Sequence, residues 1–578
     1  MQNGSEEGKT MFRHWGLKVI VILAAAVVCT QVIWAQNAGG VQGVVRSSSG
    51  APVSGAFVKL MNAERRLTFM VISQAQGRYT VNNLPAGKYL TQAIGGEMQS
   101  EMSSPVDVAA GRPATMDLSL TARRAPSLPG AWPGRQPGQQ GGEAAGGASP
   151  PPNLPDGAGK QIVLTKCGSC HGTQQVANAR QDRARWERVI ADMRLYMQGS
   201  NLAKDLTGDE AKVLLDYLAT NMSGNRGGQE RAKPDPNSRL PRTLMTGDQL
   251  KYMVVEFLLP KPDVEPHEIA VDAQGNAWIT QRTGGKIGRL DVKTLEYKEF
   301  EPPPAASKTV RLNGIVSAPG GGQLWFVDGG PNRRWFNYDI KTSQFATYTL
   351  PKLKSGNASG NTMRVHSNGT VWLNSIAANQ VIRLNPTTEQ FSVFDVPSGI
   401  KAGRTANPYG MAIDGSGKIW FVENAMNQMG RIDPVTGKID EFEVPVKNAV
   451  PRKAGMDSEG NVWVGLHGAG ILMKIDYKTT KMTLYTPPTE DAGVYSVQGD
   501  PKSKLIWFSE QYVDKIARFD PQTGTFTEFP LPNAESDHRR IDIDPNQPSR
   551  IWWTGNTSGR IGYIELVGER AGERSARQ

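Results

Sequence analysis

The stretch "PHEIAVDAQGNAWITQ", residues 266–281, decides the fold of the largest part of this chain. It returns as "PYGMAIDGSGKIWFVE" at 408–423 and as "GMDSEGNVWVGL" at 455–466, and each copy joins two alternating segments through a glycine-containing turn. A period of this kind predicts a β-propeller with one four-stranded blade per repeat, and seven aligned tryptophans predict seven blades over residues 245–566. These tryptophans recur every 43 to 48 residues, at Trp278, Trp325, Trp372, Trp420, Trp463, Trp507 and Trp552.

The two ends of the repeat region predict how the ring closes. The last repeat ends at "RIGYIEL", residues 560–566, without a following outer strand. The segment "LKYMVVEFLLP", residues 250–260, reads as a strand that precedes the first repeat without a partner. We therefore expect this N-terminal strand to complete the seventh blade and hide its edge. Residues 567–578 are expected to form a disordered tail.

Polar residues at two positions of the repeat predict a site at one mouth of the central channel. Loops that enter the innermost strand and leave the second strand line this end of a propeller, where convergent polar groups bind ligands. Counting back about eleven residues from the tryptophans gives His267, Asn313, Tyr409, Arg452, Tyr495 and His538. Three or four residues after the tryptophans come Gln281, Asp328, Glu423, His467 and Glu510. His366 occupies the turn position of Asp272 and is expected to be a structural turn residue.

The repeat phrase P-[HY]-x-[IM]-A-[VI]-D…W-[IF] is similar to that of the streptogramin B lyases, also called virginiamycin B lyases. The resemblance implies a seven-bladed propeller that opens an ester-linked cyclic peptide by elimination, using a histidine base, an acidic residue and Mg²⁺. It makes His467 in "VGLHGAG" the nearest candidate for the base and Glu510 in "WFSEQ" the nearest metal ligand. His267 is a further candidate catalytic residue. A hydrogen-bonded loop role stays open for each of them.

Residues 41–121 alternate apolar and polar positions between Gly- and Pro-containing turns, which predicts a small antiparallel β-sandwich. Gly43, "GAPVSGAFV" at 50–58 and "GRYTVNNLPAGKY" at 77–89 resemble the carboxypeptidase regulatory-like domain, a prealbumin-type sandwich. This resemblance implies a scaffolding or adhesion module without catalysis. Residues 122–156 and 223–244 are rich in Pro, Gly and polar residues and are expected to be linkers.

Between the linkers, residues 157–222 have helical character. "RARWERVIADMRLYM" at 183–197 places Trp186, Val189, Ile190 and Met193 along one helical face. "LTGDEAKVLLDYLATNM" at 206–222 opens with Thr207 and Glu210 as a capping box and continues with Val213, Leu214, Tyr217 and Leu218 as its apolar face. A small helical domain is therefore expected here.

This helical segment carries the motif "KCGSCHG", residues 166–172. In C-x-x-C-H the two thiols can bind haem covalently while the adjacent histidine reaches the iron. A structural zinc site would need two further Cys or His ligands, and none follows within 172–222. A redox dithiol would need a βαβ context, and a disulfide would close only a tiny loop and add little stability. Covalent haem c, one per chain, is the favoured interpretation.

Residues 156–222 also resemble a class I cytochrome c domain, through "KCGSCHG", "WERVIADM" and "DEAKVLLDYLATNM". By this resemblance Cys167 and Cys170 form the thioethers and His171 is the proximal iron ligand. The distal ligand of the family is usually a methionine, for which Met193 is the first choice and Met197 and Met222 are alternatives. Each methionine also fits a core-packing role.

The N-terminus predicts export. Four basic or titratable residues, at 9, 13, 14 and 18, precede the apolar run 19–28, and "VIWAQNA" at 32–38 offers cleavage after Ala35 or Gln36. Residues 1–36 are therefore expected to be a signal peptide of a periplasmic or secreted protein. Read continuously, Leu17 to Ala35 could instead anchor the protein in the membrane. The formal net charge is +10, but Lys and Arg are spread along the chain, so no nucleic-acid partner is predicted.

The sequence as a whole predicts a mainly β, multidomain protein that combines a prealbumin-like sandwich, a small all-α cytochrome c domain and a seven-bladed propeller. The leading hypothesis is an exported c-type cytochrome that transfers single electrons, with a redox partner protein or a small-molecule substrate at the propeller mouth. The alternatives are a metal-dependent C–O lyase with an accessory cytochrome, taking Mg²⁺ at the propeller, and a binding or sensing propeller.

Overall fold

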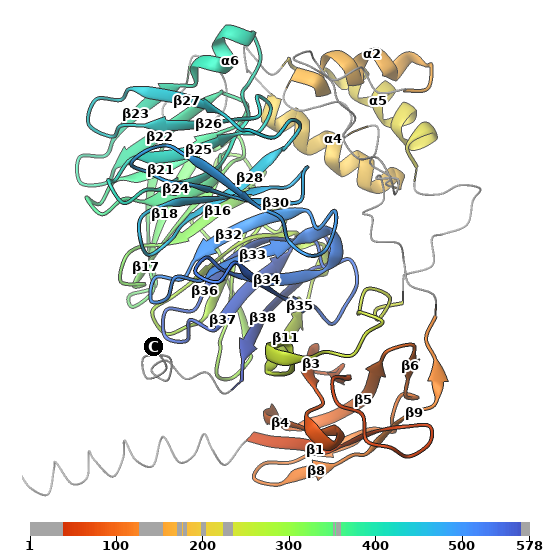
Figure 1. Cartoon of the computed structure of the whole chain (residues 1–578). Coiled ribbons are helices and arrows are strands. Elements are labelled where there is room, and N and C mark those ends of the chain that lie inside the picture. The colour runs from red at the N-terminus through yellow and green to blue at the C-terminus, as the bar shows by residue number, and fades with distance from the viewer. Residues whose placement is uncertain are drawn as a thin grey trace, which may run out of the picture. The chain divides into compact units, whose positions relative to one another are not determined.

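Figure 1 shows the computed structural model of the chain, which describes residues 38–125, 154–169, 176, 182–197, 204–223, 235–350, 353 and 360–567. The expected signal peptide, residues 126–153 and 224–234 of the two expected linkers, and residues 568–578 of the expected tail lie outside these residues. The chain divides into two compact units, of which the first comprises Met1–Arg124 with Arg242–Leu250 and the second Ala125–Pro241 with Lys251–Gln578. Within the described residues, no helix is long and apolar enough to cross a membrane.

The first unit is a β-sandwich, as expected. In one sheet β1 (Ala38–Ser47) pairs antiparallel with β4 (Arg78–Pro85) and parallel with β8 (Pro113–Thr115) and β9 (Leu118–Leu120). In the other, β5 (Gly87–Gly95) pairs with β2 (Phe57–Asn62), β6 (Met98–Gln99) and β7 (Val106–Val108). Further strands and a short 3₁₀ helix are β3 (Leu67–Ile72), β10 (Ala122–Arg123) and η1 (Ala75–Gly77).

Gly43 of β1 has a packing role that explains its place in the sandwich sequence. A Cβ atom there would lie 1.9 Å from the Met116 carbonyl oxygen, so no larger residue fits without moving the backbone. The Tyr79 hydroxyl donates a hydrogen bond of 2.5 Å to the same oxygen. Residues 242–250, with η3 (Gly247–Leu250), belong to this unit, since the Met245 amide donates to the Gly55 carbonyl at 2.9 Å.

The helical segment of the second unit consists of α2 (Ala158–Thr165), η2 (Cys167–Ser169), α4 (Arg183–Met197) and α5 (Gly208–Asn221). The capping box is confirmed, because the Glu210 amide donates to Thr207 Oγ1 and the Thr207 amide donates to the Glu210 carboxylate. The predicted apolar face of 183–197 is also confirmed: Trp186 and Ile190 are buried in one cluster, with Val189 and Met193 packed against it. Val213 is the exception, since it is exposed while Leu214 is buried.

The described residues from 252 to 567 form seven blades of four antiparallel strands each, which confirms the predicted propeller. The aligned tryptophans all lie in second strands and are at most 5 % exposed. Blade by blade, from the innermost strand outward, the strands are β12 (Pro266–Val271), β13 (Ala277–Gln281), β14 (Ile287–Leu290) and β15 (Tyr297–Phe300); β16 (Leu312–Ser317), β17 (Gln323–Asp328), β18 (Arg334–Asp339) and β19 (Gln344–Thr349); β20 (Gly360–Val365), β21 (Val371–Ser375), β22 (Gln380–Asn385) and β23 (Gln390–Asp395); β24 (Pro408–Ile413), β25 (Ile419–Glu423), β26 (Gln428–Ile432) and β27 (Ile439–Glu443); β28 (Pro451–Met456), β29 (Val462–Leu466), β30 (Ile471–Ile475) and β31 (Met482–Tyr485); β32 (Val494–Gly499), β33 (Ile506–Glu510), β34 (Lys515–Asp520) and β35 (Thr525–Pro530); and β36 (His538–Ile543), β37 (Arg550–Gly555), β38 (Arg560–Leu566) and β11 (Tyr252–Leu258).

The ring closes in the seventh blade, as the sequence predicts. Strand β11 pairs antiparallel with β38 over its whole length, from Tyr252 opposite Leu566 to Leu258 opposite Arg560 (Figure 1). The start and the end of the propeller chain are thereby held in one sheet, and the outer edge of β38 is paired. Three short helices complete the region, namely η4 (Pro262–Val264), α6 (Pro397–Ala402) and η5 (Gln511–Val513).

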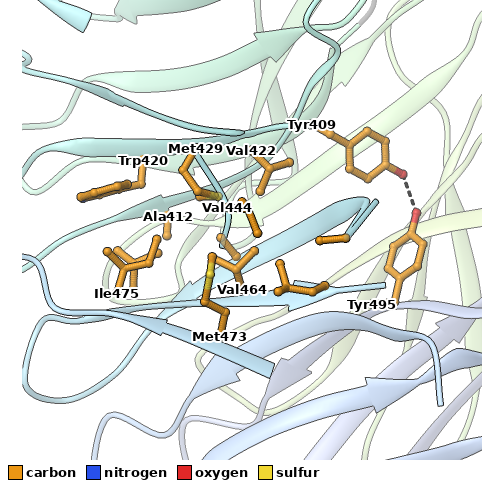
Figure 2. Packing of buried hydrophobic residues seen from close by; sticks show 14 residues of the cluster. Tyr409, Ala412, Trp420, Val422, Met429, Val444, Val464, Met473, Ile475 and Tyr495 are labelled. Atoms are coloured by element: carbon orange, nitrogen blue, oxygen red, sulfur yellow. Dashed lines mark hydrogen bonds between the residues drawn. The ribbon is translucent and has the colours of Figure 1, made fainter. Parts of the chain in front are cut away.

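Apolar layers between the blades form the propeller core. Figure 2 shows the layer between the fourth and fifth blades, where Trp420, Val422, Met429, Val464 and Met473 are fully buried. In the first, fourth and fifth blades the turn before the second strand supports its tryptophan: in the fifth blade Asp457 accepts a hydrogen bond of 2.8 Å from Trp463 Nε1 and others from the turn amides. Identical burial in every blade explains why the repeat is so clear in the sequence.

Candidate functional site at the propeller mouth

The innermost strands have an irregularity that aims side chains at the propeller axis. In each of the first six blades the register with the second strand shifts between the first and fourth residues of the innermost strand, as between Pro266 and Ile269. A bulge of this kind re-aims side chains. The consequence is visible in contacts between blades that are not neighbours, because both the second and the third residues of these strands meet near the axis.

The second residues of the innermost strands form an upper layer, made of His267, Asn313, Asn361, Tyr409, Arg452, Tyr495 and Arg539. The hydroxyls of Tyr409 and Tyr495, from the fourth and sixth blades, are 2.6 Å apart, as Figure 2 shows. The Arg452 guanidinium of the intervening blade lies 5.5 Å from the Tyr409 ring centre and 5.6 Å from that of Tyr495. Two aromatic faces and one cation therefore share a position beside the axis.

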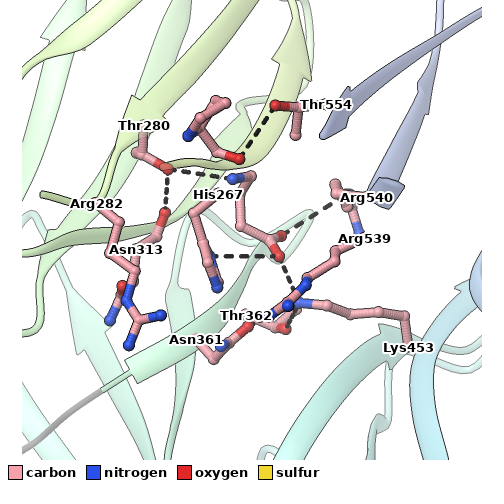
Figure 3. A network of polar contacts seen from close by, with 12 residues as sticks. His267, Thr280, Arg282, Asn313, Asn361, Thr362, Lys453, Arg539, Arg540 and Thr554 are labelled. Atoms are coloured by element: carbon pink, nitrogen blue, oxygen red, sulfur yellow. Dashed lines mark hydrogen bonds and ion pairs between the residues drawn. The ribbon is translucent and has the colours of Figure 1, made fainter. Parts of the chain in front are cut away.

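The third residues form a lower layer that fills the channel with polar groups. Lys453 Nζ, fully buried, donates to Glu268 Oε1 at 2.6 Å, to Asn361 Oδ1 at 2.8 Å and to Thr362 Oγ1 at 2.8 Å (Figure 3). Arg540 Nε lies 3.9 Å from the other Glu268 oxygen. Burial lowers the pKa of Lys453, and the adjacent Glu268 carboxylate opposes that effect. The first, third, fifth and seventh blades are thus tied together across the axis.

His467 belongs to a connected chain of hydrogen bonds at the same end. Gln511 Nε2 donates to Asp537 Oδ1 at 2.7 Å, so the Gln511 carbonyl oxygen accepts from His467 Nε2 at 2.8 Å. This arrangement assigns the ring proton to Nε2 and leaves Nδ1 to accept from the Tyr512 hydroxyl at 3.3 Å. Asp537 also binds Arg539 through two hydrogen bonds of 2.9 and 3.1 Å. Both nitrogens of His467 are therefore engaged.

His267 differs from His467 in lacking such partners. Its side chain is 3 % exposed, its Nδ1 is buried without a hydrogen bond, and the nearest carboxylate oxygen, Glu268 Oε1, is 3.9 Å away. Burial lowers the pKa of His267 well below its ordinary value, and the cations of Arg282, Lys453 and Arg539 lower it further. The ring is accordingly neutral at physiological pH.

The acidic residues that follow the tryptophans do not converge on the axis, which corrects that part of the expectation. They end the second strands, between the innermost and the third strands, but their side chains contact residues of the third and fourth strands and of α6. Glu423 accepts from the Ser398 hydroxyl at 2.7 Å, and burial raises its pKa to about 8, with a smaller contribution from Glu441. Glu510 is fully buried, and within the described part of the chain neither of its oxygens has a hydrogen bond; burial and, less strongly, Glu528 raise its pKa well above the ordinary value. Gln281 and Asp328 likewise bind residues of the outer strands.

The predicted lyase residues therefore occupy separate environments. His467 and His267 lie at the mouth, whereas Glu510 faces the Lys515 and Glu528 pair of its own blade. Within the described residues, no three His, Cys, Asp or Glu side chains come together as metal ligands. This donor set does not fit a Mg²⁺ site, and we derive no metal-dependent step. His366 fills the predicted turn role, with its Nδ1 accepting the Asn368 amide at 3.1 Å.

The repeat pattern in the sequence does not predict several residues of this site. Arg539, and not the neighbouring His538, takes the mouth position in the seventh blade, because the segment between it and Trp552 is two residues longer than in the first blade. His538 instead packs in the blade, bonded to Ser536 at 2.6 Å and to the Lys515 carbonyl at 2.8 Å. Lys453 and Glu268 follow Arg452 and His267 directly, but only the bulge brings both neighbours to the axis.

The helical segment holds the first cysteine of the predicted haem-attachment motif. Cys167 follows α2 and is half-buried, and both it and Met193 of α4 pack against one apolar cluster that includes Trp186 and Leu214. A reachable thiol and a thioether beside one apolar surface fit a covalently attached haem. Met197 and Met222 are 4 % and 2 % exposed and fill the cluster itself. Cys170 and His171 lie outside the described residues.

Comparisons with known proteins support both β-modules. Residues 313–572 match the virginiamycin B lyase family, and residues 40–121 match the carboxypeptidase regulatory-like domain. The propeller is virginiamycin B lyase-like, and the sandwich is of the carboxypeptidase regulatory type, as the sequence resemblances predict. The resemblance of residues 156–222 to cytochrome c stays a prediction. No curated protein matches the chain.

Solved structures also resemble the propeller. A streptogramin B lyase structure is 24 % identical with a TM-score of 0.49, over 56 % of this chain and 100 % of that chain. The selenomethionine-substituted virginiamycin B lyase from Staphylococcus aureus is 20 % identical with a TM-score of 0.48, over 55 % of this chain and 100 % of that chain. A catalytically inactive variant of that lyase with quinupristin is 21 % identical with a TM-score of 0.48, over the same shares.

Proposed function

We propose that this protein is an exported c-type cytochrome joined to a ligand-binding propeller. In this proposal Cys167 and Cys170 attach one haem, and His171 and Met193 are the axial ligands of its iron. When bound, the haem supplies one-electron transfer. The propeller binds the substrate or the redox partner, and the sandwich serves as a scaffold. The N-terminal segment directs export to the periplasm or the exterior, or holds the protein at the membrane.

The observation that carries the proposal is the position of Cys167. The thiol comes directly after α2, at the start of a 3₁₀ turn, and packs at the edge of the cluster that holds Trp186, Leu214 and Leu218. The motif continues with Cys170 and His171, so all three haem-attaching side chains are close in the chain. An apolar surface beside them would exclude water from a porphyrin face, which favours the reduced, less charged state of the iron.

The helices around Cys167 are suited to hold that surface rigid. Trp186 Nε1 donates to the Met222 carbonyl at 3.1 Å, which ties α4 to the end of α5. Gly159 of α2 lies against Tyr217 of α5, where a Cβ would be only 2.3 Å from the tyrosine side chain. The Tyr217 hydroxyl in turn donates to the Pro155 carbonyl at 2.6 Å. These contacts fix the helix that presents Cys167 relative to the helix that presents Met193.

The proposal is tested by the visible spectrum of the full chain exported in cells that mature c-type cytochromes. We expect a reduced-minus-oxidised c-type signal and one covalent haem per chain in a denatured pyridine haemochrome assay. Cys167→Ala should reduce covalent haem severalfold or abolish it. Met193→Ala should keep the covalent haem but change the oxidised spectrum and lower the reduction potential. Met197→Ala is the matched control, expected to leave the axial-ligand spectrum unchanged. A wild-type chain without covalent haem would overturn the proposal.

A lyase reaction at the propeller is the second candidate, supported by the family match of residues 313–572 and by the placement of His467. For His467 to act as a base, its Nδ1 would have to release the Tyr512 hydroxyl. Elimination of a cyclic depsipeptide ester that persists in Cys167→Ala and is lost in His467→Ala would support this candidate. Substrate-dependent reduction of the haem, lost in Cys167→Ala, would support electron transfer.

A further inference from the structure

One cation at the propeller mouth has no carboxylate partner in the part of the chain that the structure describes. The guanidinium of Arg452 stacks between Tyr409 and Tyr495, and its Nε is buried without a hydrogen bond. The residue is half-buried, so part of its guanidinium is open to a ligand, and arginine is the residue that most often pairs with oxyanions through a planar fork. The stacking fixes the guanidinium plane but does not neutralise its charge.

The carboxylates near the axis are already committed to other cations. Glu268 is shared by Lys453, at 2.6 Å, and Arg540, at 3.9 Å. Asp537 binds Arg539 through both of its oxygens and accepts two further hydrogen bonds from Thr557. Arg540 keeps Nε and Nη1 buried without hydrogen bonds to any residue that the structure describes. The axis therefore holds more positive than negative charge, and this excess surrounds the upper layer.

His267 is a second, independent observation at the same place. Its buried Nδ1 has no hydrogen-bond partner among the described residues, although the side chain is only 3 % exposed. A buried polar nitrogen without a partner is uncommon in a native protein and commonly marks the place of a missing ligand or water. Figure 3 shows His267 in the same network as Lys453, Arg539 and Arg540, so this unpartnered group belongs to the region of excess positive charge.

The tyrosine pair supplies a further donor. Two hydroxyl protons serve the Tyr409 and Tyr495 oxygens, which are 2.6 Å apart, and only one proton is used between them. Burial raises the pKa of Tyr409 above its ordinary value, so this hydroxyl stays protonated at physiological pH. One O–H bond is thus left to donate to a ligand oxygen beside the Arg452 guanidinium.

We propose that the propeller mouth binds the carboxylate of a small organic acid, held by the Arg452 guanidinium and a hydroxyl of the Tyr409 and Tyr495 pair. The rings of His467 and Tyr512, 4.5 Å apart between centres, offer an aromatic surface for the body of the ligand. A planar carboxylate matches one guanidinium fork and one hydroxyl, whereas phosphate is usually bound by more donors. The inference deepens the proposed function by naming the substrate class, and it rests on that function for the link between binding and electron transfer.

The test is isothermal titration calorimetry of the full exported chain with benzoate, its neutral analogue benzamide, and inorganic phosphate. We expect benzoate to bind at least tenfold more tightly than benzamide or phosphate. Arg452→Gln should weaken benzoate binding at least tenfold. Arg431→Gln is the matched control, because Arg431 also stacks on two rings, Trp420 and Phe442, but lies in the outer part of its blade and has Asp440 as a partner at 2.9 Å. This control should bind benzoate as the wild type does.

Equal affinities for benzoate and benzamide, preferential binding of phosphate, no benzoate binding, or equal losses in Arg452→Gln and Arg431→Gln would each overturn the carboxylate site. Near-ultraviolet circular dichroism of both variants checks that the propeller is intact. Tyr409→Phe provides a second variant and should weaken benzoate binding severalfold. Calorimetry does not depend on the haem, so failure of this inference is distinguishable from failure of the proposed cytochrome. Covalent haem without benzoate binding would overturn the carboxylate site and leave the proposed cytochrome standing.

Discussion

The layers between the blades are apolar, whereas the axis of the propeller is lined with charged and polar side chains. Between the blades, each repeat contributes the same buried tryptophan and a set of buried aliphatic residues, and Figure 2 shows one such layer with Trp420, Val422 and Val464. At the axis, Glu268, Lys453 and Arg540 come from three different blades, Arg452 directly precedes Lys453, and these residues do not repeat. The comparison teaches that the repeated positions determine the fold, whereas the non-repeated positions decide what the mouth can bind.

The largest effect is expected from a change between the blades. Trp463→Ala removes a fully buried ring from the fifth blade and leaves a cavity between blades, so it should lower the free energy of unfolding by about 3–5 kcal/mol. Urea denaturation followed by tryptophan fluorescence measures this loss. Val435→Ala, at a side chain that is 92 % exposed, is the control and should leave stability nearly unchanged. Equal stabilities of the two variants would show that the layers do not hold the blades together.

A somewhat smaller effect is expected at the axis. Lys453→Met should lower the free energy of unfolding by about 3 kcal/mol, because it leaves the buried Glu268 carboxylate without its closest cation. Adding Glu268→Gln removes the uncompensated charge, so the double variant should be more stable than Lys453→Met alone. Lys478→Met, at a turn lysine of the fifth blade, controls for loss of a positive charge. A double variant no more stable than the single one would show that the pair does not act as a charge pair.

The sequence predicts the repeated positions in the blades better than the non-repeated positions at the axis. The tryptophan period predicts the blades, and the lone strand before the first repeat predicts the closure by β11, because both depend on patterns that recur along the chain. Lys453 and Glu268 are 185 residues apart and meet only because the ring brings non-neighbouring blades together. The residues after the tryptophans were expected at the axis, but strand alternation and the third strand turn Glu423 and Glu510 outward. No local pattern in the sequence distinguishes these two directions.

The smallest effect is expected for the ionisation of Glu423, a buried side chain away from the axis. The pH dependence of stability that it causes tests whether the interior of the blades is apolar. The pKa of Glu423 is raised from 4.5 to about 8, mainly by burial, so the folded state binds a proton more tightly than the unfolded chain does. Stability from this group is therefore complete below about pH 4.5 and is lost as the pH rises to 8 and above. Glu423→Gln stays neutral at every pH and keeps the possibility of accepting from Ser398.

The wild type should consequently lose more stability than Glu423→Gln between pH 5 and pH 8, by roughly 1–2 kcal/mol when relaxation around the charge is allowed for. Urea denaturation of both proteins at the two pH values measures the difference. Glu441→Gln serves as the control, since it removes the neighbouring charge and leaves Glu423 buried; it should retain most of the wild-type pH dependence. If Glu423→Gln lost stability in parallel with the wild type, ionisation of this side chain would not oppose folding, and water would have to reach it within the blade. The blades would then be less sharply divided from the polar axis than their buried tryptophans indicate.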